Sequence, residues 1–217
     1  FLSSCYFQIV FWHKKSRPLW PDMLLVYFTA YGWSNICMLH WMDMSKKVTR
    51  LYEQFQPEHY DLTLDIDRDA MSFTGTVVIK GKKTGRPSER LTFHQKGLKI
   101  TSATITKHDK KGDQTLVVKR INNQDSYDEV RLHTEDMAYP GDYTVALQFS
   151  GHINKDMHGI YPCFFKHNGE AKKLIATQFE SHHAREALPC IDEPEAKATF
   201  DLTLVTPSGE TVLANTP

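Results

Sequence analysis

The sequence predicts an all-β fold in which antiparallel sheets pack as a sandwich, and two observations carry that prediction. From residue 60 onward, hydrophobicity has a period of two, because apolar and polar side chains alternate along several segments. Turn-forming residues interrupt these segments about every ten residues, a spacing typical of β-sandwiches. Residues 44–217 show no long amphipathic helical pattern and no internal repeat, so strands are left as the main elements.

The alternation is clearest in the segment 60–67. Tyr60, Leu62, Leu64 and Ile66 are separated there by polar residues, which places one apolar face on a core and one acidic face in water. The same alternation occurs at residues 143–149 and 200–204. The remaining runs rich in strand-forming residues are 73–79, 98–105, 115–118, 130–132 and 174–179.

Glycine, proline and polar clusters separate these runs. The expected loops and turns are 82–87, 110–113, 122–125, 140–141 and 207–209. A single short helical turn is expected at residues 181–187, with Ser181 as its N-cap and Pro189 ending it.

Composition excludes several classes of function. Lys and Arg together number 26, as do Asp and Glu, so no net charge draws the chain to nucleic acid or to an anionic membrane. The four cysteines, Cys5, Cys37, Cys163 and Cys190, form no C-x-x-C pair and are too few for a disulfide scaffold. This cysteine usage favours a reducing, cytoplasmic compartment.

Residues 1–43 differ from the rest and hold all four tryptophans. Residues 23–42 contain no Asp, Glu, Lys or Arg and are long enough to span a bilayer. Three interpretations stay open: a membrane anchor, upstream sequence that does not belong to the native protein, or a structural hairpin or helix that packs on the domain. The segment is expected to be helical or disordered. Met44 is a plausible initiator, so the domain itself is assigned to residues 44–217.

Chemistry is concentrated in residues 176–200. Glu180 follows a predicted strand and precedes a turn, a position from which a carboxylate can bind a cation, act as a base or cap the turn. On the residues alone, a plain surface carboxylate is the simplest interpretation. The chain contains no H-E-x-x-H, no G-x-S-x-G and no phosphate-binding glycine motif, so no catalytic residues and no metal ligands are assigned within it.

Other residues of this segment are interpreted structurally. Adjacent His182 and His183 diverge by about 100° on a helix, so a metal site shared with Cys190 or Asp192 is disfavoured. Arg185 is expected to form an ion pair with Asp192 or with the glutamate beside it, which would brace the turn.

The segment as a whole resembles the signature of the aminopeptidase N family of zinc peptidases, which runs T-Q-F-E, A-R and then F-P-C-x-D-E-P-x-x-K-A-x-F. The matching positions here are Thr177-Gln178-Phe179-Glu180, Ala184-Arg185, Leu188-Pro189-Cys190, Asp192-Glu193-Pro194, Lys197-Ala198 and Phe200. So many residue types at fixed spacing make a specific match.

Shorter matches extend the resemblance over about residues 50–217. They are residues 57–62, 73–75, 159–161 and 213–217. The sequence departs from the family pattern at Leu188, where Phe is usual, at Pro162, at Thr216 and at the pair 182–183. These departures leave the fold prediction intact and affect the details of a substrate pocket.

The resemblance implies a saddle-like β domain that precedes a zinc-binding catalytic domain C-terminal to Pro217. By the same resemblance, Glu180 binds the free α-amino group of a peptide substrate and Gln178 lines the pocket for its first side chain. Arg185, Pro189, Cys190, Asp192, Glu193 and Pro194 then belong to the structural part of the signature. The zinc ligands lie outside this chain, which alone is expected to be inactive.

Two alternatives to this interpretation remain. The chain is either a free-standing β-sandwich module that binds peptides, or part of an aminopeptidase anchored in a membrane through residues 23–42. Sequence that encodes H-E-x-x-H after Pro217 would exclude the first alternative, and release from membranes by carbonate would count against the second.

Overall fold

The computed structural model describes residues 50–110, 112–207 and 209–214, and it confirms the all-β prediction. The described residues form eleven strands and three short 3-10 helices. The strands are β1 (Phe55–Asp67), β2 (Ser72–Lys83), β3 (Ser88–His94), β4 (Lys99–Asp109), β5 (Gly112–Leu116), β6 (Val118–Gln124), β7 (Glu129–Ala138), β8 (Gly141–His152), β9 (Gly159–His167), β10 (Glu170–Gln178) and β11 (Thr199–Val205). The 3-10 helices are η1 (Leu51–Glu53), η2 (Asp125–Tyr127) and η3 (Ala184–Glu186).

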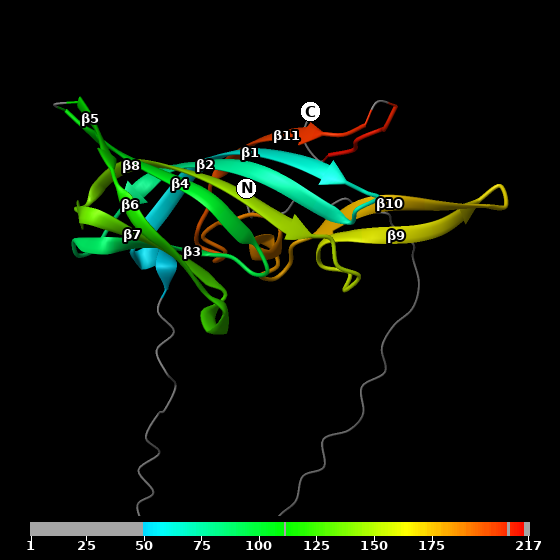
Figure 1. Cartoon of the computed structure of the whole chain (residues 1–217), viewed down its shortest axis with the longest axis horizontal. Coiled ribbons are helices and arrows are strands. Elements are labelled where there is room, and N and C mark those ends of the chain that lie inside the picture. Colours follow the sequence, from blue (N-terminus) through cyan, green and yellow to red (C-terminus); the bar gives the residue numbers. More distant parts are fainter. Residues whose placement is uncertain (1–49, 111, 208, 215–217) are drawn as a thin grey trace, which may run out of the picture. The chain divides into compact units, whose positions relative to one another are not determined.

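The strands form three sheets (Figure 1). Six strands are ordered β11-β1-β2-β8-β4-β5, three are ordered β3-β7-β6, and β9 pairs with β10 alone. Every pairing is antiparallel except that of β1 with β11, which is parallel, with Tyr60 opposite Phe200. The antiparallel pairing predicted from the sequence therefore holds at every pair except this edge. Alternation did not reveal the exception, since it shows which face of a strand is buried but not which way the strand runs.

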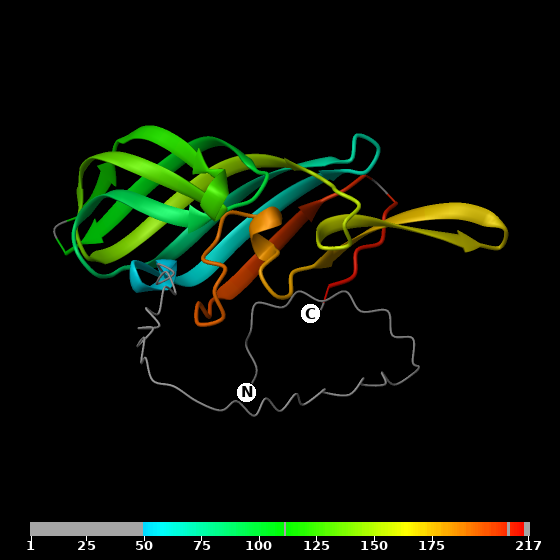
Figure 2. The same ribbon diagram turned by 90° about the horizontal axis from the view of Figure 1, so that it is seen from below.

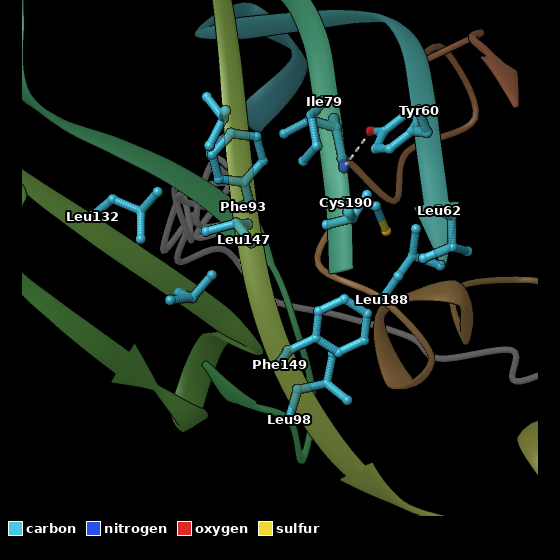
Figure 3. Close-up of a cluster of buried hydrophobic side chains, with 14 of the residues drawn as sticks. Tyr60, Leu62, Ile79, Phe93, Leu98, Leu132, Leu147, Phe149, Leu188 and Cys190 are labelled. Carbon is cyan, nitrogen blue, oxygen red and sulfur yellow. Dashed lines mark hydrogen bonds between the residues drawn. The ribbon is translucent and has the colours of Figure 1, made fainter. Parts of the chain in front are cut away.

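The hydrophobic core joins the six-stranded and the three-stranded sheets. Its largest members come from both sheets, and Phe55 of β1 meets Phe93 of β3 edge to face, with ring centroids 5.3 Å apart. Figure 3 shows side chains from β1, β2, β3, β7 and β8 converging with Leu188 and Cys190 of the chain after β10. The segment resembling the family signature is thus part of the core.

Two strands, β3 and β9, contain none of the predicted runs, and only the first residue of β6 was predicted as strand. In β3, Leu91, Thr92, Phe93 and His94 are buried in succession, so this strand shows no alternation. Its end is covered on more than one side because His94 forms an isolated β-bridge with Cys190. The other, β9, contains a proline and pairs only with β10.

Several expected loops proved shorter than predicted. Residues 122–124 belong to β6, and the helix η2 starts at Asp125. Residues 82–83 belong to β2, and residues 112–113 belong to β5. In β5 and β6 polar residues are tolerated because residues 112–115 and 123 face solvent. At the end of β2, Lys83 is buried, and its Nζ donates to the carbonyl of Arg86 at 2.8 Å.

The ribbon of β9 and β10 extends past the end of the β1–β2 hairpin in both views (Figures 1 and 2). Phe164 and Phe165 are exposed on it. The end of β10 opposite this tip leads into the candidate site, so the ribbon and the site share a strand.

The predictions made for residues 1–43, including a membrane anchor at 23–42, lie outside the described residues. Within the described ranges, no helix has the length and apolar character needed to cross a membrane.

Candidate functional site

The candidate site is the chain that follows β10. After Gln178 the backbone turns, and the amide of His183 donates a hydrogen bond to the carbonyl of Phe179 at 2.9 Å. The helix η3 then begins with His183 as N-cap and without a side-chain cap. The predicted helical turn is therefore shorter than expected, and Ser181 does not cap it, because its hydroxyl lies 2.7 Å from Nδ1 of His182.

Glu180 lies in this turn and is exposed. Within the described ranges its side chain makes no hydrogen bond and no ion pair. Its two neighbours in sequence, Phe179 and Ser181, line a cavity of about 70 Å³ that reaches to Tyr60 and Phe200. The turn thus presents an uncommitted carboxylate beside a small, mostly apolar hollow.

Gln178 is the last residue of β10 and is partly buried opposite Gly159 of β9. Thr177 and Phe179, on either side of it, line a second groove of about 210 Å³. Because neighbouring residues in a strand point to opposite faces, Gln178 faces away from that groove. The groove is lined mainly by aliphatic side chains, among them Leu62, Leu64, Leu174, Leu188, Leu202 and Leu204.

Arg185 and Asp192 brace the chain beyond the turn, as the sequence predicted. The Arg185 side chain donates from Nε to Oδ2 of Asp192 at 3.0 Å, and its backbone amide reaches the same oxygen at 3.3 Å. A second carboxylate, that of Asp128, lies 3.8 Å from the guanidinium. Both partners of the main pair are largely buried, with side-chain exposures of 13% and 12%.

Two buried side chains hold the backbone of the signature segment in place. The amide of Ile191 donates to the hydroxyl of Tyr60 at 3.1 Å, and the dashed line in Figure 3 ends on that hydroxyl. The amide of Asp192 donates to Nδ1 of His94 at 3.0 Å. Burial, together with the charge of Arg185, lowers the pKa of His94 to about 3. His94 is therefore neutral at physiological pH, with Nδ1 free to accept.

The remaining signature residues also serve the fold. Glu193 accepts from the amide of Leu51 at 2.6 Å and from Nε of Arg50 at 3.1 Å, which ties η1 to the segment. Pro189 and Cys190 are buried, and Pro194 is exposed. Cys163 and Cys190 are not joined to each other by a disulfide.

Among the described residues, Cys190 and Asp192 do not group with His182 or His183 as potential metal ligands. The carboxylate of Asp192 accepts from Arg185, and Cys190 lies at the bridge to β3. His183 instead meets His158 and Glu186, and the potential ligand atoms of these three side chains lie within 4.8 Å of one another. The sequence did not predict this cluster, because His158 is 28 residues from Glu186. Nor did it predict Tyr60 and His94 as acceptors, because they are 131 and 98 residues from the amides that donate to them.

Comparison with known proteins identifies the family to which this all-β domain and its signature segment belong. The family model for the Peptidase M1 N-terminal domain matches residues 56–217, and the chain belongs to that family. Aminopeptidase N of Lactococcus lactis subsp. lactis is 42% identical over 177 residues, which cover 80% of this chain and 19% of that protein.

Other relatives match a similar share of the chain. Aminopeptidase N of Lactobacillus delbrueckii subsp. lactis is 40% identical over 78% of this chain and 19% of its own length. Aminopeptidase A of Gloydius brevicauda is 30% identical over 77% of this chain and 17% of its own length. The chain therefore spans about a fifth of the curated relatives it matches.

Proposed function

We propose that this chain is the substrate-recognising N-terminal domain of a zinc aminopeptidase that removes N-terminal residues from peptides. In this proposal Glu180 binds the free α-amino group of the substrate, and Gln178 lines the pocket for the first side chain. The zinc ion and the catalytic residues belong to a domain C-terminal to Pro217. Membership of the M1 N-terminal family supports this assignment, as does the exposed, uncommitted carboxylate of Glu180.

The carboxylate at position 180 has the chemistry that an exopeptidase needs. Only the first residue of a peptide carries an α-ammonium group, so a fixed carboxylate that binds this group sets which peptide bond is cleaved. An ammonium–carboxylate hydrogen bond in a site shielded from water contributes about 1.5–3 kcal/mol. Among the described residues, Glu180 would break no existing hydrogen bond or ion pair on binding substrate. The ion pair of Arg185 with Asp192 would hold the chain that follows its turn.

The chain does not provide the catalytic zinc site. None of its eleven histidines begins H-E-x-x-H, so the residues present do not fit the metal centre of this peptidase class. The role left to this chain is to bind and orient the substrate. Purified residues 44–217 are expected to release no product from an aminoacyl-anilide, and measurable hydrolysis would contradict the assignment of catalysis to another domain.

Reading the coding sequence beyond Pro217 is the first test. A frame that encodes H-E-x-x-H supports the aminopeptidase, whereas a stop codon at Pro217 supports the alternative of a free-standing peptide-binding module. A membrane anchor at residues 23–42 is tested separately by carbonate extraction of the expressed protein, in which retention in the pellet supports the anchor.

The role of Glu180 is tested by Glu180→Gln in the protein extended through its H-E-x-x-H segment. Loss of the charged partner should lower kcat/KM for an aminoacyl-anilide by at least about tenfold, because a lost bond to a charged group is worth that much. Glu89→Gln is the matched control, since Glu89 lies exposed on β3. Equal activity of Glu180→Gln and wild type would contradict the proposal.

A further inference from the structure

A second cluster of chemically capable side chains lies beside the turn that presents Glu180. His158 directly precedes β9, His183 is the N-cap of η3, and Glu186 is its last residue. Nδ1 of His158 lies 2.7 Å from Oε2 of Glu186, and Nδ1 of His183 lies 3.1 Å from Oε1. Two imidazoles from two different segments thus aim the same ring nitrogen at one carboxylate.

The orientation of the two rings favours a shared ligand. His158 and His183 stack with ring centroids 4.0 Å apart and planes 18° apart. Both Nδ1 atoms lie on the side of the Glu186 carboxylate, since each is within hydrogen-bond distance of one of its oxygens. A zinc ion has bonds of about 2.0–2.2 Å to nitrogen and oxygen, which places neighbouring ligand atoms a little over about 3 Å apart in a tetrahedron. The ligand atoms here already lie within 4.8 Å of one another, so small side-chain shifts would bring them to zinc.

The surroundings fix the carboxylate in place. The Glu186 side chain is only 7% exposed, whereas His158 and His183 are 29% and 20% exposed and leave a path from solvent. Gly159 has φ +65°, and a Cβ there would lie 2.9 Å from Oε2 of Glu186. A glycine at this position is therefore needed both for the backbone conformation and for the approach of the carboxylate.

Lys96 is the one cation in contact with the cluster among the described residues. Its Nζ lies 3.1 Å from Oε1 of Glu186, and its side chain is 48% exposed. This ammonium leaves Oε2 for a metal ion, and an outer hydrogen bond of this kind orients a ligating carboxylate. Its positive charge also opposes cation binding, so Lys96 is expected to weaken the site without abolishing it.

We propose that His158, His183 and Glu186 bind a divalent transition metal ion of the zinc type, with water as the fourth ligand. Two imidazole nitrogens and one carboxylate oxygen are a common three-residue ligand set for zinc. The ion would join the start of β9 to η3 and so stiffen the support of the Glu180 turn. This site is separate from the catalytic zinc proposed for another domain, and it does not depend on the proposed function.

The test is calorimetric titration of Zn²⁺ into the 217-residue chain, with the visible spectrum of the Co²⁺ form as a second readout. One ion is expected per chain, with a Co²⁺ spectrum of four-coordinate nitrogen and oxygen ligation. His158→Ala and Glu186→Gln should each weaken Zn²⁺ binding at least about tenfold, since each removes one of three protein ligands. Glu186→Gln keeps the shape of the side chain, and circular dichroism checks that both variants fold.

Two controls make the test specific. His182 stacks on His183 with centroids 4.7 Å apart, but its Nδ1 is directed at Ser181, so His182→Ala should bind Zn²⁺ like the wild type. Lys96→Gln should bind Zn²⁺ several-fold more tightly, whereas Lys99→Gln, at an exposed position at the start of β4, should not.

Several results would overturn the proposal. They are the absence of Zn²⁺ binding by the wild type, undiminished binding by folded His158→Ala and Glu186→Gln, or an equal loss in His182→Ala. A thiolate charge-transfer band in the Co²⁺ form would also overturn it, because such a band would place the ion on cysteine.

Discussion

The signature segment divides into two parts that differ in how the protein uses them. Residues 185–193 are largely buried and hydrogen-bonded to β1, β3 and η1 through Tyr60, His94 and Leu51. The turn at residues 179–182 is mostly exposed, and Glu180 within it has no partner among the described residues. One continuous motif therefore contains a buried part that holds the fold and an exposed part whose carboxylate is left unpaired among the described residues.

This difference shows what a sequence motif leaves undecided. A signature specifies residue types at fixed spacing, but it does not distinguish a carboxylate that braces the fold from one that binds substrate. Burial and hydrogen bonding make that distinction, because a buried charge must be paired whereas an exposed, unpaired one is available. Asp192 and Glu180 are the two cases, and the predictions below test whether they differ as the structure indicates.

The largest effect is expected when the buried brace is broken. Arg185→Ala leaves Asp192 without its main partner at a position where the carboxylate is 12% exposed. Removing one member of a buried ion pair typically costs about 3–5 kcal/mol, so the free energy of unfolding in urea should fall by that amount. Arg120→Ala, at an exposed site on β6, should change it by less than about 0.5 kcal/mol. Similar losses in the two variants would remove the basis for a structural role of Arg185.

Acid should weaken the same part of the segment through His94. Its pKa is about 3 in the folded state and about 6.5 in the unfolded chain, so between these values the unfolded chain binds more protons. The contribution of His94 to the free energy of unfolding is therefore fully present above pH 6.5. It decreases as the pH is lowered, by about 3 kcal/mol at pH 4.5. Urea unfolding at a series of pH values measures this slope.

His94→Asn is the control for that pH dependence. An asparagine oxygen can accept the Asp192 amide near the position of Nδ1 but does not titrate. The slope between pH 4.5 and 6.5 should therefore become shallower in His94→Asn, and an unchanged slope would mean that other groups cause the acid sensitivity.

A smaller loss is expected for Tyr60→Phe. The substitution keeps the ring that stacks on Phe200 at 4.6 Å but removes the acceptor of the Ile191 amide. A buried amide left without its partner costs about 1–2 kcal/mol, which should appear as a lower urea midpoint at unchanged m-value. Tyr139→Phe, whose side chain is 55% exposed, should leave the midpoint unchanged. A midpoint for Tyr60→Phe equal to that of Tyr139→Phe would show that the hydroxyl does not hold the segment.

The sequence predicted those parts of the fold that depend on residues close together in the chain. Alternation located β1 and β8, and spacing within one segment predicted the Arg185–Asp192 pair. The direction of β11 and the burial of both faces of β3 depend on contacts between distant segments, and alternation carries no information on these.

The same limit applied to the site. Tyr60 and His94 lie 131 and 98 residues from the amides they accept, so no spacing rule links them to the signature. His158 and Glu186 are 28 residues apart and meet only because β9 pairs with β10. Glu180 and Gln178 could be singled out because they match a family pattern, and their roles stay predictions.

The most direct test of the division within the signature is to compare Glu180→Gln with Asp192→Asn by equilibrium unfolding in urea. Both substitutions neutralise a carboxylate and preserve its shape. The free energy of unfolding should fall by about 3 kcal/mol in Asp192→Asn, because the buried Arg185 then loses the nearer of its two counter-charges, and should change by less than about 0.5 kcal/mol in Glu180→Gln. Equal losses in the two variants would contradict the account, because Glu180 would then be part of the fold rather than free for a ligand.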